Sequence, residues 1–132
     1  MYQRTGSDLR PVQGEWGLTV LPLTEIRSSK EFFDYEAKYT PGVSQEITPA
    51  EIPNEVAEKI RNTASALYDR LNCRGIVRVD FIVEDTGNLY FPEVNTMPGQ
   101  SENSLVPQQV RAAGKSLREF YGMLIEECLR KK

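Results

Sequence analysis

The sequence predicts a single domain of the α+β class, in which helices pack on an antiparallel β-sheet. Residues 78–83 and 90–95 are rich in β-branched and aromatic side chains and flank a segment of turn formers, which indicates a β-hairpin. Apolar residues recur at steps of three and four over about 53–72 and again over 117–128, which indicates two long helices. A chain of 132 residues is long enough for one domain with its own core.

The segments before the first long helix have weaker patterns. Residues 1–17 are predicted to form an irregular lead-in. Residues 18–23 predict a strand, in which Pro22 favours an edge position or a bend. Residues 27–31 are polar and predict a loop, whereas residues 44–48 alternate weakly and predict a further strand.

The predicted helices have recognisable ends. Gly75 follows the helix at 53–72 as a stop signal. Pro107 suits the first position of a short helix, because proline lacks the N–H that would be unpaired there. Ser116 and Glu119 form a capping box that opens the last helix. The apolar face of this last helix comprises Leu117, Phe120, Tyr121, Leu124, Ile125 and Cys128.

The turn of the hairpin sets the expected strand register. Gly87 can adopt the positive φ that tight hairpin turns require. If Glu84 pairs with Leu89, then Asp80 lies opposite Glu93, and Arg78 lies opposite Asn95. Alternation then gives one partly polar face, which comprises Arg78, Asp80, Ile82, Phe91, Glu93 and Asn95. The other face is apolar and predicts contact with the core, through Val79, Phe81, Val83, Tyr90 and Val94.

Two carboxylates opposite each other need an explanation. At a separation of ~5 Å and an effective dielectric constant of ~20 they repel by about 3 kcal/mol, and a divalent cation would reverse the sign of this energy. Asp80, Glu93 and Asn95 offer only oxygen ligands, which suits Mg²⁺ or Mn²⁺ rather than zinc. Arg78 would hold a phosphate or an oxyanion beside the metal. The alternative is a solvated edge hairpin in which Arg78 pairs with Asp80 or Glu93, and the hairpin alone leaves both interpretations open.

The segment that follows the hairpin has features of an anion-binding site. Gly99 allows its backbone N–H to approach a ligand closely. Ser104 and Leu105 precede a predicted helix N-terminus, where free N–H groups bind anions. The alternative is a surface loop with an ordinary helix cap.

Four blocks of sequence stand out by their order and spacing. They are Leu-Pro-Leu-Thr-Glu-Ile at 21–26, Phe-Phe-Asp-Tyr-Glu-Ala-Lys-Tyr at 32–39, Arg-Val-Asp-Phe at 78–81, and residues 93–99 continuing into Ser-Leu-Val-Pro at 104–107. Together they resemble the C-terminal part of the D-alanine–D-alanine ligase family, within the ATP-grasp superfamily. The resemblance implies the fold of an ATP-grasp C-terminal subdomain over most of the chain.

The resemblance also implies a reaction. ATP phosphorylates the carboxylate of one D-alanine, and the amine of a second D-alanine attacks the acyl phosphate to give the dipeptide for peptidoglycan precursors. By this resemblance, Asp80, Glu93 and Asn95 would ligate the Mg²⁺ ions that bridge the ATP phosphates. Arg78 and the N–H of Gly99 would stabilise the acyl phosphate and the tetrahedral intermediate.

Substrate contacts are implied for six further residues. Ser104 and Leu105 would hold the carboxylate of the second D-alanine, and Lys38 and Tyr39 would belong to a loop that closes over the phosphates. In the family, an aromatic residue at the Tyr39 position goes with D-alanine rather than D-lactate as the second substrate. Contacts with adenine would come from Phe32 and Ile82.

The resemblance leaves two alternatives. A D-alanine–D-lactate ligase, or another ATP-grasp ligase for a carboxylate and an amine, would share the same motifs. The other alternative is a non-catalytic α+β binding or assembly module with a fortuitous acidic hairpin. In the family's enzymes, N-terminal and central parts precede this region and carry the lysines that grip the phosphates. Without these missing parts as partners we expect the chain to be inactive alone, and its exposed apolar surface would favour a homodimer.

Composition narrows the partners and the compartment. A net charge of −3 gives no basic face for nucleic acid. No apolar run has the length of a membrane span, and no secretory signal is visible. Together with two cysteines that are expected to be reduced, Cys73 and Cys128, this predicts a cytoplasmic protein without nucleic-acid or membrane partners.

Overall fold

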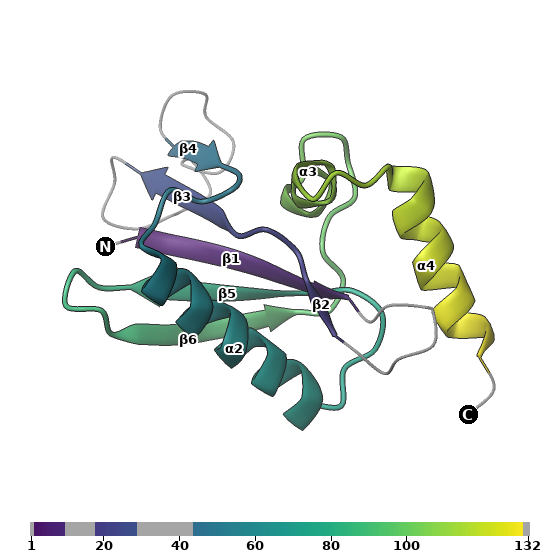
Figure 1. Ribbon diagram of the computed structural model, residues 1–132, viewed down its shortest axis with the longest axis horizontal. Helices are drawn as coiled ribbons and strands as arrows, with labels where there is room; N and C mark the ends of the chain where they lie inside the picture. Colours follow the sequence, from purple (N-terminus) through teal and green to yellow (C-terminus); the bar gives the residue numbers. More distant parts are fainter. Residues whose placement is uncertain (1, 10–17, 29–43, 131–132) are drawn as a thin grey trace.

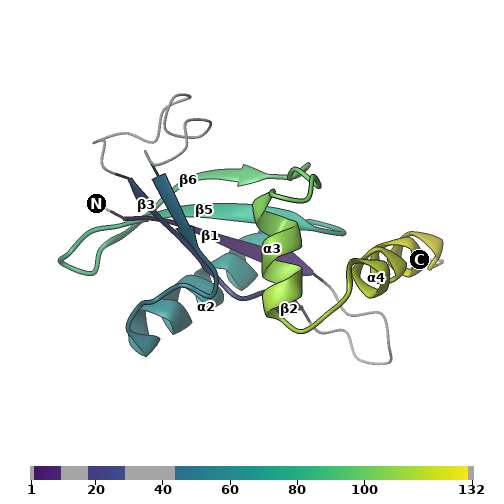
Figure 2. The same cartoon turned by 90° about the horizontal axis from the view of Figure 1, so that it is seen from above.

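The computed structural model describes residues 2–9, 18–28 and 44–130, which form one antiparallel sheet and three helices (Figures 1 and 2). The order along the sheet is β4-β3-β1-β5-β6, and β2 pairs with the C-terminal end of β1. The predicted α+β class with an antiparallel sheet is therefore confirmed. The strands are β1 (Tyr2–Leu9), β2 (Thr19–Val20), β3 (Thr24–Ser28), β4 (Ser44–Ile47), β5 (Val77–Val83) and β6 (Leu89–Asn95). The helices are α2 (Asn54–Arg70), α3 (Leu105–Ala112) and α4 (Leu117–Leu129).

The strand β1 lies in the middle of the sheet and was not expected from the sequence. Residues 1–17 were predicted to be an irregular lead-in, and this is wrong for Tyr2–Leu9, which pair antiparallel with β5 on one side and β3 on the other. The segment lacks an alternating apolar pattern, and its strand conformation comes from long-range pairing on both edges, which a local pattern does not contain. The predicted strand at 18–23 is reduced to Thr19–Val20, and β3 extends to Ser28 into the predicted loop.

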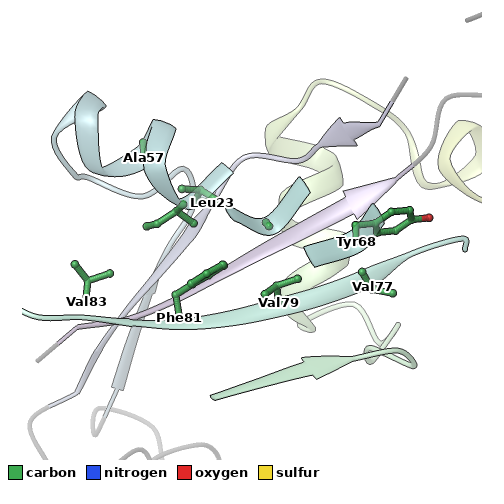
Figure 3. Packing of buried hydrophobic residues seen from close by; sticks show 9 residues of the cluster. Leu23, Ala57, Tyr68, Val77, Val79, Phe81 and Val83 are labelled. Atoms are coloured by element: carbon green, nitrogen blue, oxygen red, sulfur yellow. The ribbon is translucent and has the colours of Figure 1, made fainter. Parts of the chain in front are cut away.

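The main core lies between α2 and β5 (Figure 3). The predicted helix at 53–72 is confirmed with bounds Asn54–Arg70. Its inward face carries Ile60 and Tyr68, and the hydroxyl of Tyr68 donates to the carbonyl of Gly75 at 2.7 Å. Alternate residues of β5 meet this face, and they are Val77, Val79, Phe81 and Val83. Burial of each such side chain contributes about 1.5–3 kcal/mol, so one face of β5 is fixed against α2.

A second, smaller cluster joins α3 and α4 to the connection between β2 and β3. Leu21 packs with Val106, Val110 and Phe120, all of which are buried. The predicted capping box is present, since the Ser116 hydroxyl accepts a hydrogen bond from the N–H of Glu119 at 3.1 Å. Both views show α4 beyond the ends of the strands (Figures 1 and 2).

The predicted apolar face of α4 is only partly correct. Phe120 is buried and Leu124 is half-buried, as expected. Ile125 is 59% exposed, and Cys128 is also exposed. Within the described ranges, the cluster that packs on this helix includes its residues up to Leu124. Among the described residues, no helix is long and apolar enough to cross a membrane.

The strand β3 carries a buried carboxylate, Glu25, which is 2% exposed. Arg27 donates from Nε to its Oε1 at 3.1 Å and from Nη2 to its Oε2 at 3.2 Å. The hydrogen bond to Glu25 raises the pKa of Arg27 above its ordinary value, so the arginine stays charged at any working pH. A second carboxylate, that of Glu51, lies 3.4 Å from the same Nη2. This buried charge is thus neutralised within the domain.

Candidate functional site

The two predicted carboxylates lie directly opposite each other on β5 and β6. The register pairs Asp80 with Glu93 and Arg78 with Asn95, as the sequence predicted. Residues directly opposite in an antiparallel pair share a face, so the acidic pair lies on one side of the sheet. The two environments differ. Asp80 is 4% exposed because β5 has a strand on each side, whereas the Glu93 side chain on the edge strand β6 is 61% exposed.

The register near the turn differs from the prediction. Val83 pairs with Leu89, and Ile82 pairs with Tyr90, so β6 contains one more residue than β5 between this end and the acidic pair. The expected pairing of Glu84 with Leu89 is therefore wrong. The irregularity is a β-bulge, in which two residues of one strand oppose one residue of its partner.

The bulge exchanges the faces of two aromatic residues. Phe91 was expected beside the carboxylates, but its ring lies 6.3 Å from that of buried Phe81, on the core side. Tyr90 was expected on the core side, but it lies opposite Ile82 and shares the face of the acidic pair. Pro92 explains the location, because proline has no N–H to donate to a regular ladder and is found at edges and bulges.

Arg78 holds the acidic pair together. Its Nε and Nη2 atoms lie 2.9 Å and 3.1 Å from the two carboxylate oxygens of Asp80, and Nη2 lies 3.8 Å from Oε1 of Glu93. This is the ion pair that the alternative interpretation of the hairpin expected. The guanidinium compensates one of the two negative charges, and a net charge of −1 remains on this group of three side chains. The acidic pair therefore does not require a metal for its stability.

The donor set nevertheless suits a magnesium ion that also binds phosphate. Asp80, Glu93 and Asn95 provide hard oxygen ligands on neighbouring positions of two paired strands. The Oδ1 atom of Asn95 accepts a hydrogen bond from the N–H of Met97 at 3.0 Å, which orients this side chain. The described part of the chain contains no group of three or more His, Cys, Asp or Glu side chains placed to hold a metal. The two carboxylates of Asp80 and Glu93 and the amide oxygen of Asn95 still fit Mg²⁺ if phosphate and water supply its other ligands, since Mg²⁺ is usually bound through one or two carboxylates.

The connecting loop (residues 96–104) leads from β6 to α3 and brings together Gly99 and Ser104. A Cβ atom at Gly99 would lie 2.9 Å from Oγ of Ser104, which is shorter than real contacts allow. Oγ of Ser104 in turn lies 2.6 Å from Oγ of Ser101, within hydrogen-bond distance. A larger residue at position 99 would therefore have to displace the Ser104 hydroxyl. Whether the Gly99 N–H also binds a ligand, as the sequence suggested, stays a prediction.

The helix α3 begins earlier than expected. Ser104 is its N-cap and Leu105 its first residue, whereas Pro107 was predicted to be first. A proline is tolerated throughout the first helical turn, because none of the N–H groups there has an intrahelical partner. The Ser104 side chain makes no capping hydrogen bond, so it leaves the N–H groups of this turn available to an anion.

Side chains from α3 and α4 hold the connecting loop through hydrogen bonds that no sequence pattern indicated. Most of them donate to backbone carbonyls, which any residue type presents. Tyr121 donates to Oε1 of Gln100 at 3.0 Å, Gln100 to the carbonyl of Pro98 at 3.0 Å, Arg111 to that of Glu102 at 2.8 Å, and Gln108 to that of Asn103 at 2.8 Å.

The remaining predicted contacts are only partly within the described structure. Ile82 is half-buried on the face of the acidic pair, where it neighbours Tyr90. Phe32, Lys38 and Tyr39 lie outside the described residues. Their roles stay predictions.

Comparison with known proteins identifies relatives of this chain. The family model described as "D-ala D-ala ligase C-terminus" matches residues 10–126. A D-alanine–D-alanine ligase of Phocaeicola vulgatus is 48% identical over 107 residues, which cover 81% of this chain and 33% of the relative. The chain thus spans about a third of the length of the curated relatives that it matches.

Solved structures give the same picture. The D-alanine–D-alanine ligase of Bacillus anthracis complexed with ATP matches with a TM-score of 0.76 at 32% identity, over 98% of this chain and 38% of that protein. The VanG D-Ala:D-Ser ligase of Enterococcus faecalis matches with a TM-score of 0.73 at 32% identity, over 94% of this chain and 35% of that protein.

Proposed function

This chain belongs to the D-alanine–D-alanine ligase family, as its C-terminal portion, and on that premise we propose that it supplies the metal-binding and second-substrate half of an ATP-dependent ligase. The reaction joins two D-alanines through an acyl phosphate for peptidoglycan precursor synthesis in the cytoplasm. The observation that supports this most strongly is the placement of Asp80 opposite Glu93, beside Arg78, on two paired strands.

ATP would supply the phosphoryl group. A carboxylate oxygen of the first D-alanine attacks the γ-phosphorus and ADP leaves; the amine of the second D-alanine then attacks the acyl carbon and phosphate leaves. Mg²⁺, when bound, would neutralise the phosphate charges. Asp80, Glu93 and Asn95 would hold it. The residues present fit a mechanism that depends on charge neutralisation and positioning more than on a side-chain nucleophile.

The remaining residues act on the substrates directly. Arg78 is already oriented by its two hydrogen bonds to Asp80, and its charge would stabilise the acyl phosphate and the tetrahedral oxyanion. The Gly99 N–H would donate to the same oxyanion. The N-terminus of α3, at Ser104 and Leu105, would bind the carboxylate of the second D-alanine. Ile82 and Phe32 would contact adenine, and Lys38 and Tyr39 the phosphates.

The test uses a complete ligase, meaning this chain joined to the N-terminal and central parts that its relatives possess. We expect it to release ADP and phosphate and to form D-alanyl-D-alanine, and we expect the isolated chain to show no turnover. Asp80→Asn should lower turnover at least 100-fold and leave the circular dichroism spectrum unchanged. Wild-type turnover in this variant would contradict the proposed metal-ligand role.

The second substrate is the point on which a related function competes. The likeness to the VanG D-Ala:D-Ser ligase equals that to the B. anthracis ligase in sequence identity, at 32%. A competition assay with equal D-alanine, D-serine and D-lactate, followed by mass spectrometry of the product, separates these activities. We expect mainly D-alanyl-D-alanine. A complete ligase that turns over no nucleotide with any of the three would favour the non-catalytic binding module.

A further inference from the structure

The side chain of Gln108 connects two segments that are far apart in the sequence, β4 and the connecting loop. The Nε2 atom of Gln108 on α3 donates to Oε2 of Glu46 on β4 at 2.8 Å and to the carbonyl of Asn103 in the connecting loop at 2.8 Å. Both partners are acceptors only, so the orientation of the amide is determined by the contacts themselves. A primary amide has two N–H donors, and both are used.

The first partner belongs to the sheet face of the acidic pair. Glu46 pairs with Ile26 of β3, and both Ile26 and Ile82 lie opposite Gln3 of β1. Residues directly opposite each other share a face, so Glu46, Ile26 and Ile82 lie on one side of the sheet. Asp80 is two residues from Ile82 and shares that side. Gln108 therefore reaches the far edge of the face that carries the candidate metal ligand.

The second partner belongs to the part of the loop that ends at the helix. Asn103 directly precedes Ser104, and the backbone N–H of Gln108 also donates to the carbonyl of Ser104 at 3.4 Å. A loop stabilised by a few hydrogen bonds changes position when one of them is lost, because little apolar area holds it. The side chain of Gln108 is thus placed to determine where Ser104 stands relative to β4.

We propose that Gln108 is a positioning residue, which sets the separation between β4 and the 101–104 part of the connecting loop. This inference rests on the proposed function, because it gives the separation a purpose: it holds the N-terminus of α3 where the carboxylate of the second substrate binds. Glu46 and Gln108 act as one unit in this respect, since each hydrogen bond restrains the same amide.

Hydrogen–deuterium exchange on the 132-residue chain tests the positioning without any activity. In Gln108→Met, which preserves the length of the side chain, we expect backbone amides of 44–47 and of 101–104 to exchange about five- to tenfold faster, the effect of roughly one lost hydrogen bond. Unchanged exchange in either segment overturns the proposal.

Two variants serve as controls for this measurement. Arg111→Met removes the hydrogen bond to Glu102 in the same loop but no contact with β4, so it should accelerate exchange only in 101–104. Glu46→Gln retains an acceptor oxygen and should resemble the wild type, whereas Glu46→Met should accelerate exchange in 44–47. Equal effects of Glu46→Gln and Glu46→Met would mean that the hydrogen bond to Gln108 does not hold β4 in place, and would overturn the proposal.

Kinetics of the complete ligase test whether this separation matters for binding of the second substrate. Gln108→Met should raise the KM for D-alanine at the second site about fivefold with kcat within twofold, and the double variant Glu46→Met/Gln108→Met should be no worse. An unchanged KM, or additive effects of the two substitutions, would refute the positioning role. If the unsubstituted complete ligase is inactive, the proposed function fails, and the exchange experiment still decides the structural role of Gln108.

Discussion

The hairpin of β5 and β6 and the connecting loop that follows it are held in place by different forces. The hairpin has a backbone ladder and a buried apolar face against α2. The connecting loop is held mainly by single hydrogen bonds from side chains of α3 and α4. The carboxylates that we propose as metal ligands thus stand on the firmly packed element, whereas the groups that we propose to bind the second substrate stand on the loop with fewer contacts. Substitutions in the two regions should therefore differ in kind as well as in size.

The largest expected effect is the loss of the hairpin's core contact. Phe81 on β5 is fully buried in the core that β5 forms with α2, so Phe81→Ala should reduce the free energy of unfolding by about 3–5 kcal/mol. Phe91→Ala is the matched control, because this ring packs on Phe81 but is 42% exposed, and it should cost about 1 kcal/mol. Urea unfolding of the chain measures both. Equal losses would mean that the depth of burial against α2 does not determine how much each ring stabilises the hairpin.

Next in size is the removal of the cation between the carboxylates. Arg78→Met leaves Asp80, with a side chain only 6% exposed, beside Glu93 without a compensating charge, which should cost about 2–3 kcal/mol. If the acidic pair binds a divalent ion, millimolar Mg²⁺ should restore part of this stability. The double variant Arg78→Met/Asp80→Asn should be more stable than the single variant and insensitive to Mg²⁺. A thermal melt of Arg78→Met that does not respond to Mg²⁺ would argue against the metal site.

A smaller effect is expected in the connecting loop. Gly99→Ala places a Cβ atom against Oγ of Ser104, and relief of the contact should cost about 1–2 kcal/mol. Gly122→Ala is the control, because its Cβ would meet nothing within 4 Å and alanine favours the helix α4. Adding Ser104→Gly should restore the stability of Gly99→Ala. A loss that persists in this double variant would place the cause outside the Gly99–Ser104 contact.

The smallest expected effect concerns a single fastening hydrogen bond. Tyr121→Phe removes the donor to Gln100 and keeps the ring contact with Phe120, whose centroid lies 5.2 Å away. The free energy of unfolding should fall by about 0.5–1.5 kcal/mol, while exchange of the loop amides increases. A larger fall in stability, without faster exchange in the loop, would show that Tyr121 acts through the core instead.

The sequence predicted the parts of the site that depend on local pattern. The pairing of Asp80 with Glu93 followed from the turn and from strand alternation, and it is correct although the turn register was wrong by one residue. The pairing near the turn is shifted by one residue, and the bulge at Pro92 adds one residue to β6, so that Asp80 still meets Glu93. The cap at Ser116 was predicted for the same reason, since both partners lie within one helical turn.

What the sequence did not predict depends on contacts between distant segments. Residues of β1 become a strand only through pairing with β3 and β5. The side chains that hold the connecting loop donate mostly to backbone carbonyls, which every residue type has, so the sequence cannot show where these bonds form. The bond between Gln108 and Glu46 joins positions 62 residues apart. The resemblance to a family implied the reaction and the roles of the site residues, but it indicated none of these long-range contacts.

The magnesium dependence of turnover decides whether Asp80 and Glu93 hold the ion that carries the phosphates, as we propose. In a complete ligase, Glu93→Gln should raise the half-saturating Mg²⁺ concentration at least tenfold and lower maximal turnover at least tenfold. Its stability should remain within about 0.5 kcal/mol of the wild type, because this side chain is mainly exposed. Turnover and Mg²⁺ dependence equal to those of the wild type would contradict the account.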